Sequence, residues 1–94
     1  MTNIDNYRNS VAETFSWGMM ALSDTDSMGH INESDLIDAV ENIKAASLED
    51  VDYITNWVID VMSGLLFMEG VPEACICNAL RPMAEACNAV HNFS

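Results

Sequence analysis

The sequence predicts an all-α protein, a compact bundle of about four helices whose last helix is kinked or broken near Pro82. Apolar residues recur at three- and four-residue steps along most of the chain, which is the period of an amphipathic helix. Capping signals divide these periodic segments, and no segment alternates as a strand does. The 94 residues and the hydrophobic content of 50% are sufficient for one core. We therefore expect a single helical domain over residues 1–94.

The first predicted helix begins after Thr2, because Thr2 and Asp5 have the spacing of a capping box. Its apolar residues share one face over about 20 residues. They are Ile4, Tyr7, Val11, Phe15, Gly18 and Leu22. Small polar residues and Gly29 interrupt this pattern between residues 23 and 30 and predict a connection.

The second predicted helix follows Asn32, a residue type that favours the N-cap position. Glu33 and Asp35 lie in its first turn, where the helix dipole stabilises negative charge. The apolar stripe consists of Leu36, Ile37, Val40 and Ile43. Glu33, Asp38 and Glu41 are predicted to point largely away from that stripe.

The third predicted helix begins at another capping box, formed by Ser47 and Asp50, and ends at Gly70. Its main apolar face consists of Val51, Ile54, Val58, Val61, Leu65 and Met68. Further apolar residues lie outside this face: Trp57, Ile59, Leu66 and Phe67. A helix that is apolar over so much of its circumference is central or self-associating. We expect this helix to be the most buried.

The fourth predicted helix has Pro72 in its first turn, the position where proline is tolerated. Its stripe consists of Ile76, Leu80, Met83, Cys87 and Val90. Pro82 lies in the middle and costs about 3 kcal/mol unless the helix adapts. The expectation is a kink near residues 80–82, or a break with a short fifth helix. Short connections favour up-down-up-down packing.

The charge of the chain is strongly acidic: 15 Asp and Glu face 3 Lys and Arg, for a net charge of −12. Ten of these acids lie between Asp24 and Asp60, where Lys44 is the only Lys or Arg. Direct nucleic-acid binding is not expected, since only Arg8, Lys44 and Arg81 could contact phosphates. The acid surface either keeps the protein soluble or meets a basic protein partner.

The second and third predicted helices carry their acids at helical steps, hence about 5–6 Å apart on the surface. Duplex DNA has one charge per about 1.7 Å of its axis, so such a stripe imitates its field at lower density. The candidate partner-binding residues are Glu33, Asp38, Glu41, Glu49, Asp52 and Asp60.

Small, single-domain, strongly acidic chains without catalytic motifs resemble phage or mobile-element counter-defence proteins of the anti-CRISPR or anti-restriction type. The resemblance is one of size and charge, and no family site is carried over. It implies a non-enzymatic inhibitor that occupies the basic, nucleic-acid-handling surface of a host defence complex as a DNA mimic. The implied location is the cytoplasm of a bacterial host cell, if the protein is phage-encoded.

An alternative reading is a small helical adaptor or homodimer with an apolar interface. Its contact residues would be Trp57, Ile59, Leu66 and Phe67. Salt separates the two readings, because exposed charges are screened over about 8–10 Å at physiological ionic strength. An electrostatic complex should weaken with salt, and an apolar one should hardly change.

Residues 24–35 resemble the calcium loop of an EF-hand. Asp24, Asp26 and Asp35 occupy positions 1, 3 and 12, and Gly29 occupies position 6. Met28 stands at position 5, where its thioether is a poor ligand for a hard cation, and Asp35 is shorter than the usual Glu. We favour an acidic connection and keep a degenerate calcium site as a further alternative.

The three cysteines, Cys75, Cys77 and Cys87, form an odd count that favours a reducing cytoplasm and a packing role. His30 and His91 are far apart in sequence, and only residue type supports Cys87 as a nucleophile. We therefore expect no enzyme and no cofactor. No apolar run approaches the about 20 residues that span a bilayer, so no membrane partner is expected.

Overall fold

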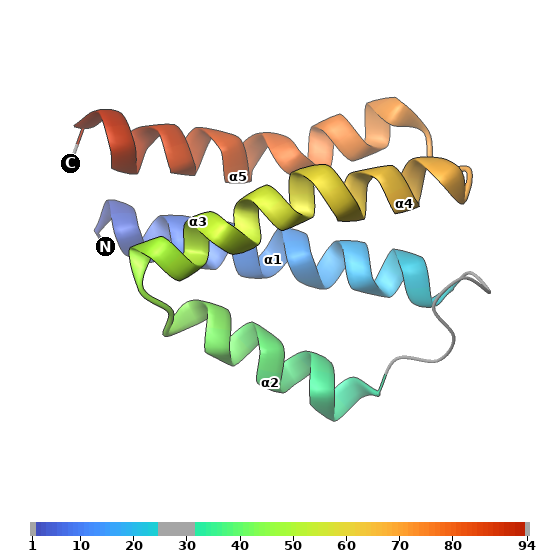
Figure 1. Ribbon diagram of the computed structural model, residues 1–94, viewed down its shortest axis with the longest axis horizontal. Helices are drawn as coiled ribbons and strands as arrows, with labels where there is room; N and C mark the ends of the chain where they lie inside the picture. Colours follow the sequence, from blue (N-terminus) through green and yellow to red (C-terminus); the bar gives the residue numbers. More distant parts are fainter. Residues whose placement is uncertain (1, 25–31, 94) are drawn as a thin grey trace.

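The computed structural model describes residues 2–24 and 32–93, which form four helical rods and no strand. The third rod consists of three consecutive elements, α3, η1 and α4. In chain order the elements are α1 (Asn3–Ser23), α2 (Glu33–Lys44), α3 (Leu48–Trp57), the π-helix η1 (Val58–Met62), α4 (Ser63–Met68) and α5 (Glu73–Phe93). Successive rods run in opposite directions, which confirms the predicted up-down-up-down bundle (Figure 1).

The N-caps of the first three rods are those that the sequence predicts. The side chain of Thr2 accepts a hydrogen bond from the Asp5 amide, and that of Ser47 accepts one from the Asp50 amide. Asn32 caps α2 by accepting from the Ser34 amide at 2.9 Å. Each such cap contributes about 1 kcal/mol to stability, so the rod starts are locally encoded.

The central rod is α1, which packs against α2, α3, α4 and α5. Its buried residues are Tyr7, Val11, Ala12, Thr14, Gly18 and Leu22. The expectation that residues 48–68 form the most buried helix was wrong. That rod contributes to the core from one side but leaves Tyr53, Phe67 and Met68 exposed on the other.

A π-helical turn interrupts the rod formed by residues 48–68. The Ser63 amide donates to the Val58 carbonyl, five residues back, where an α-helix would use the carbonyl of Ile59. The hydroxyl of Ser63 instead donates to that Ile59 carbonyl. The turn therefore contains one extra residue. The Ile59 carbonyl, which no longer accepts from the Ser63 amide, accepts from the Ser63 hydroxyl.

Beyond Val58 the buried face of this rod lies one position later than predicted. The predicted face continues from Val58 to Val61, Leu65 and Met68. In the structure Met62 and Leu66 are buried, each with an exposed fraction of 1%, whereas Met68 is 80% exposed. A 3.6-residue period counted from Val51 already favours Met62 over Val61, whereas the predicted face advances by only about 3.4 residues per step and drifts away from the core. The longer π turn adds to this difference.

Gly18 of α1 faces this π turn and lets the two rods approach closely. A Cβ at position 18 would overlap the sulfur of Met62. Met62 is itself 1% exposed, so its side chain is confined by the core. The small residue on α1 thus accommodates the bulky one on η1.

The last helix, α5, runs through Pro82 without a break, and its axis bends along its length (Figure 1). The kinked form of the prediction is therefore observed, and the alternative of a fifth helix was wrong. The hydroxyl of Thr14 donates to the carbonyl of Ala79 at 3.3 Å, one turn before Pro82. Proline lacks the N–H that would bond the carbonyl of Asn78, four residues back, and α1 supplies a side-chain donor to the neighbouring carbonyl.

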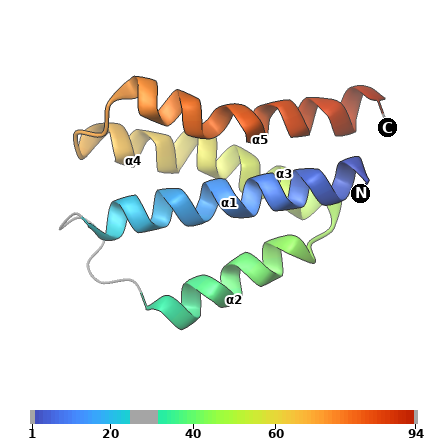
Figure 2. The same ribbon diagram turned by 180° about the vertical axis from the view of Figure 1, so that it is seen from behind.

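The second helix, α2, lies on the flank of the bundle and packs chiefly against α1 (Figure 2). Ile43 is its only buried residue, and Ile37 of the predicted stripe is 50% exposed. A groove of about 530 Å³ lies between α2 and α1 and is lined in part by Met20 and Leu36. No helix among the described residues is both long and apolar enough to cross a bilayer.

Candidate functional site

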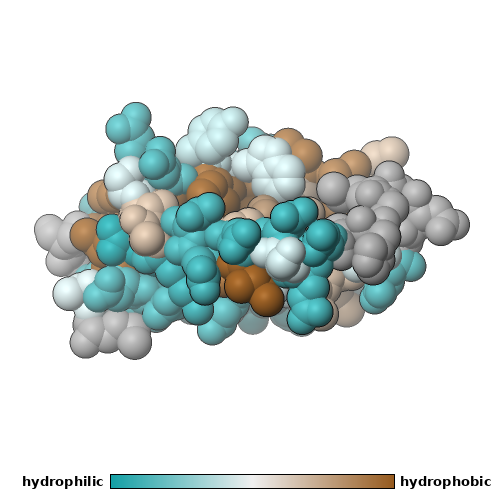
Figure 3. Space-filling view, turned by 90° about the horizontal axis from the view of Figure 1, so that it is seen from below, coloured by the Kyte–Doolittle hydropathy of each residue, from teal (hydrophilic) through white to brown (hydrophobic). Residues whose placement is uncertain are grey.

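Five of the six predicted partner-binding acids are exposed. Glu33, Asp38 and Glu41 lie on α2, Glu49 on α3 and Asp60 on η1. The side of the molecule that carries α2 is mainly hydrophilic, with a small apolar patch among the polar residues (Figure 3). These acids therefore have the accessibility that a partner-binding role requires.

The helix α2 also carries an acid that the predicted set omits. Asp35 is exposed, which gives this twelve-residue helix four exposed carboxylates. Lys44, in the last turn, is its only Lys or Arg. Within the described part of the chain, none of the four carboxylates forms an ion pair. Their charge is therefore not neutralised by an ion pair with residues 2–24 or 32–93.

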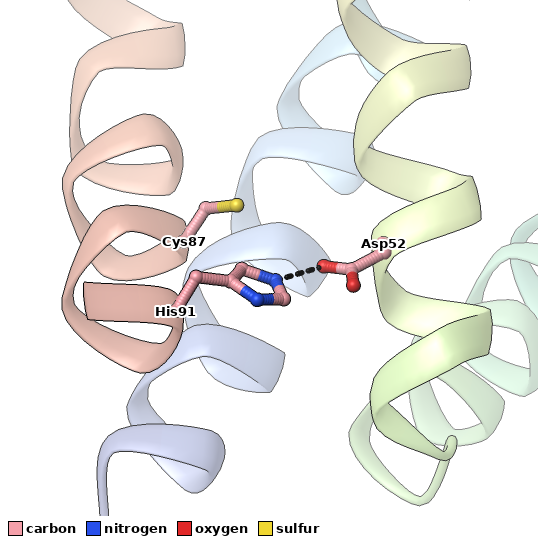
Figure 4. A group of neighbouring side chains, drawn as sticks. All are labelled: Asp52, Cys87 and His91. Carbon is pink, nitrogen blue, oxygen red and sulfur yellow. Dashed lines mark hydrogen bonds and ion pairs between the residues drawn. The ribbon is translucent and has the colours of Figure 1, made fainter. Parts of the chain in front are cut away.

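The sixth acid, Asp52, has a different environment from the other five. Its Oδ1 atom accepts a hydrogen bond from the hydroxyl of Tyr7 at 2.6 Å and lies 2.9 Å from Nε2 of His91 (Figure 4). Two other rods, α1 and α5, thus hold this carboxylate. The prediction that Asp52 points outward with the other acids was wrong, because an α3 residue one step beyond Val51 faces α5.

The hydroxyl of Tyr7 connects this carboxylate to the buried part of α3. It lies 2.8 Å from the hydroxyl oxygen of Thr55, which also donates to the Val51 carbonyl at 2.9 Å. Two hydroxyl protons therefore serve three contacts. Because Tyr7 donates its proton to Asp52, Thr55 must share its own between Val51 and Tyr7.

This arrangement changes the proton affinity of two groups. Burial and the bond to Asp52 raise the pKa of the Tyr7 phenol well above its ordinary value. Burial alone would raise the pKa of Asp52, but the hydrogen bonds from Tyr7 and His91 outweigh it and hold that pKa below its usual range. Neutral Tyr7 and ionised Asp52 are thus the preferred pair at neutral pH.

Cys87 completes a cluster with Asp52 and His91. One ligand atom from each residue, the thiol sulfur, a carboxylate oxygen and a ring nitrogen, lies within 4.8 Å of the others. The sequence signal for two of the three residues is the four-residue step from Cys87 to His91, which places both on one helix face. Asp52 could not be assigned from sequence, because its approach to α5 depends on how the two rods pack.

The cluster is not arranged as a cysteine nucleophile with a histidine base. In Figure 4 the sulfur of Cys87 lies on the Asp52 side of the ring, and the second ring nitrogen of His91 points away from it. A base must approach the thiol with one nitrogen while the carboxylate holds the other. Here the thiol and the carboxylate lie toward the same nitrogen.

The described residues of the predicted calcium loop and the other two cysteines do not belong to this cluster. Asp24 ends α1 and Asp35 lies in the first turn of α2, while Asp26 lies outside the described residues. The calcium hypothesis thus stays a prediction. Cys75 and Cys77 are exposed, so their predicted packing role was wrong, because Ile76 between them takes the inward position.

The predicted apolar interface keeps only part of its residues. Leu66 belongs to the core, and Trp57 is half-buried against Phe15, with ring centroids 6.1 Å apart. Ile59 and Phe67 are exposed. Three further apolar residues of the same rod are exposed as well: Tyr53, Val61 and Met68.

The chain matches no known protein family, no curated protein and no solved structure in comparisons with each. Function is therefore argued from the surfaces and the cluster described above.

Proposed function

We propose that the protein is a non-enzymatic inhibitor that uses the acidic surface of α2 to bind a basic protein surface. The observation that carries the proposal is the set of four exposed carboxylates on α2, which form no ion pair with another described residue: Glu33, Asp35, Asp38 and Glu41. The helix dipole favours Glu33 and Asp35 in the first turn. Asp38 and Glu41 lie beyond that turn, three residues apart, where like charges repel, so stability alone does not favour them. A basic partner converts that repulsion into attraction.

The partner that suits this surface is one that normally holds nucleic acid, such as a component of a host defence complex. Such grooves carry Lys and Arg that neutralise phosphates spaced by a few ångströms. Carboxylates about 5–6 Å apart along a helix imitate that charge pattern at lower density. The three cysteines are free thiols, which are typical of proteins in a reducing cytoplasm.

The test is an affinity capture from bacterial lysate at low and high salt, with bound proteins identified by mass spectrometry. The variant Glu33→Gln/Asp35→Asn/Asp38→Asn/Glu41→Gln removes the charge of α2. The matched control removes four exposed charges elsewhere: Glu13→Gln/Glu69→Gln/Glu73→Gln/Glu85→Gln. Both variants change the formal net charge from −12 by four, to −8.

The expected result is a nucleic-acid-binding partner that is captured at low salt, released at high salt and lost only with the α2 variant. Equal loss with both variants would assign the effect to net charge, and equal retention would remove α2 from recognition. Circular dichroism of both variants should show unchanged helix content, since the altered side chains are exposed.

A second candidate function is an apolar homodimer through the rod of residues 48–68. The specific observation is that five of its large apolar residues are exposed, with Phe67 at 61% and Met68 at 80%. Analytical ultracentrifugation distinguishes this function, because an apolar dimer persists at high salt. The variant Ile59→Glu/Phe67→Glu should convert such a dimer into a monomer, whereas the α2 variant should not.

A further inference from the structure

We propose that Asp52, Cys87 and His91 form a zinc-binding site between α3 and α5, independent of the acidic surface of α2. The three side chains converge from two rods, with Asp52 in the second turn of α3 and His91 near the end of α5 (Figure 4). The site would join the last turns of α5 to the first turns of α3.

The chemistry of the three donors selects zinc. A thiolate sulfur, an imidazole nitrogen and a carboxylate oxygen are the ligands that Zn²⁺ takes in proteins. Calcium and magnesium prefer sites made wholly of oxygen, so the sulfur of Cys87 and the nitrogen of His91 disfavour them. The Asp52 carboxylate and the Cys87 thiolate together balance the charge of a divalent cation.

The spacing of the donor atoms is close to what zinc requires. Ligands at about 2.0–2.3 Å from zinc lie about 3.3–3.7 Å from one another in a tetrahedron. The three donor atoms of the site are within 4.8 Å of one another, and the Asp52 and His91 atoms are 2.9 Å apart. Side-chain rotations that move the donor atoms by about 1 Å bring these separations to the tetrahedral values, without movement of the rods.

The residue behind the site supports the same role. Tyr7, which is fully buried, donates its hydroxyl proton to Asp52 and so fixes the direction of the carboxylate. Carboxylates that bind metals are commonly oriented by such a donor, whose loss weakens metal affinity about 10- to 100-fold. Thr55 in turn contacts the Tyr7 hydroxyl at 2.8 Å. The core therefore preorganises one ligand before metal binds.

Metal binding balances as a ligand exchange with release of a proton. The Cys87 thiol gives its proton to solvent and binds as thiolate. Nε2 of His91 binds through its lone pair, so the ring proton is carried by Nδ1, and Asp52 binds as a carboxylate. Water supplies the fourth ligand from the solvent side, since the His91 side chain is 44% exposed.

The experiment titrates zinc into the full chain against a chromophoric chelator, and it repeats the titration with Co²⁺ as a spectroscopic probe. The variant Cys75→Ser/Cys77→Ser serves as background, because it removes both exposed thiols and leaves Cys87 alone. We expect one metal ion per chain in this background. The cobalt form should show a sulfur-to-metal charge-transfer band together with the visible bands of a four-coordinate ion.

Two further variants assign the ligands. Cys87→Ser and His91→Gln, each in that background, should weaken zinc binding by at least about tenfold, and Cys87→Ser should abolish the charge-transfer band. Asp50→Asn, an exposed acid in the first turn of α3, is the matched control and should leave binding unchanged. His91 is exposed, so its variant should fold normally, with circular dichroism as the check.

Three results would overturn the site. The first is no stoichiometric binding at micromolar zinc. The second is binding that disappears with Cys75→Ser/Cys77→Ser. The third is equal affinity in the Cys87→Ser and His91→Gln variants and in their background.

Discussion

The helix α2 and the central helix α1 hold their residues in very different ways. Six residues of α1 are buried and contact the three other rods, whereas α2 buries only Ile43 and packs chiefly against α1. The four acids of α2 are exposed and unpaired among the described residues, while Asp52, from the same predicted stripe, is held by α1 and α5. The comparison teaches that acidic side chains of one predicted stripe are held by the fold in one region and left exposed in the other.

The largest expected effect tests whether the core extends past the π turn. Leu66→Ala should lower the free energy of unfolding by about 2–5 kcal/mol, because it leaves a cavity at a buried site. Met68→Ala, at an exposed position of the same rod, should change it by no more than about 0.5 kcal/mol. Urea denaturation followed by circular dichroism measures both. A larger loss in Met68→Ala would restore the predicted face.

This pair of residues also shows how far the sequence could predict the fold. The rods, their caps, their antiparallel order and the kinked last helix follow from periodicity and capping residues, which are local signals. The π turn is not local in this sense. Its close contact, between Gly18 and Met62, joins two different rods. The face beyond Val58 was predicted one residue out of phase because the chosen residues advance by about 3.4 rather than 3.6 per step.

The candidate functional residues also divide into those that local sequence signals predict and those that depend on the packing of different rods. Exposure of Asp38 follows from its position opposite the apolar stripe of α2, and the structure agrees. Glu33 and Glu41 are exposed too, but they line the groove beside that stripe and do not lie opposite it. The cluster of Asp52, Cys87 and His91 requires knowledge of which rods are neighbours. The sequence contains the four-residue step between Cys87 and His91, but our sequence-based prediction did not use it and relied on residue type alone.

The second prediction concerns the hydroxyl that connects the core to Asp52. Tyr7→Phe should destabilise the protein by about 1.5 kcal/mol at neutral pH, the lower end for a hydrogen bond to a charged group, because Asp52 is partly exposed. Tyr53→Phe removes an exposed hydroxyl and should change stability by less than about 0.5 kcal/mol. Both are measured by thermal unfolding with a chelator present, so that metal does not contribute.

The pH dependence of the same variant sharpens the assignment. The pKa of Tyr7 is raised in the folded protein, so its contribution is complete below the unfolded value of about 10 and is lost as pH rises above it. The pKa of Asp52 is lowered, so its contribution is present above about pH 4 and is lost as pH falls through the folded value. In a plot of the free energy of unfolding against pH, Tyr7→Phe should therefore reduce the slope at both the acid and the alkaline ends. An unchanged alkaline limb would place the ionising phenol elsewhere.

The third prediction tests the close approach of α1 to η1. Gly18→Ala should destabilise by about 1 kcal/mol, since overpacking costs about 1–3 kcal/mol and the gain in helix propensity offsets about 1 kcal/mol. In the background of Met62→Ala the clash is removed, so the same change should become neutral or stabilising. A double-mutant cycle by urea denaturation measures this coupling. Additive effects would mean that Gly18 and Met62 are not in contact.

The smallest expected effect concerns the acids of α2. Asp38→Asn/Glu41→Gln should change the free energy of unfolding by no more than about 0.5 kcal/mol, because both side chains are exposed and repulsion within the helix falls. Glu33→Gln/Asp35→Asn should cost slightly more, about 0.3–1 kcal/mol for each charge, since these residues lie in the first turn, where the helix dipole favours them. A larger loss from Asp38 and Glu41 would give those carboxylates a structural role. Stability that hardly responds, together with loss of partner capture, would leave recognition as the role of these charges.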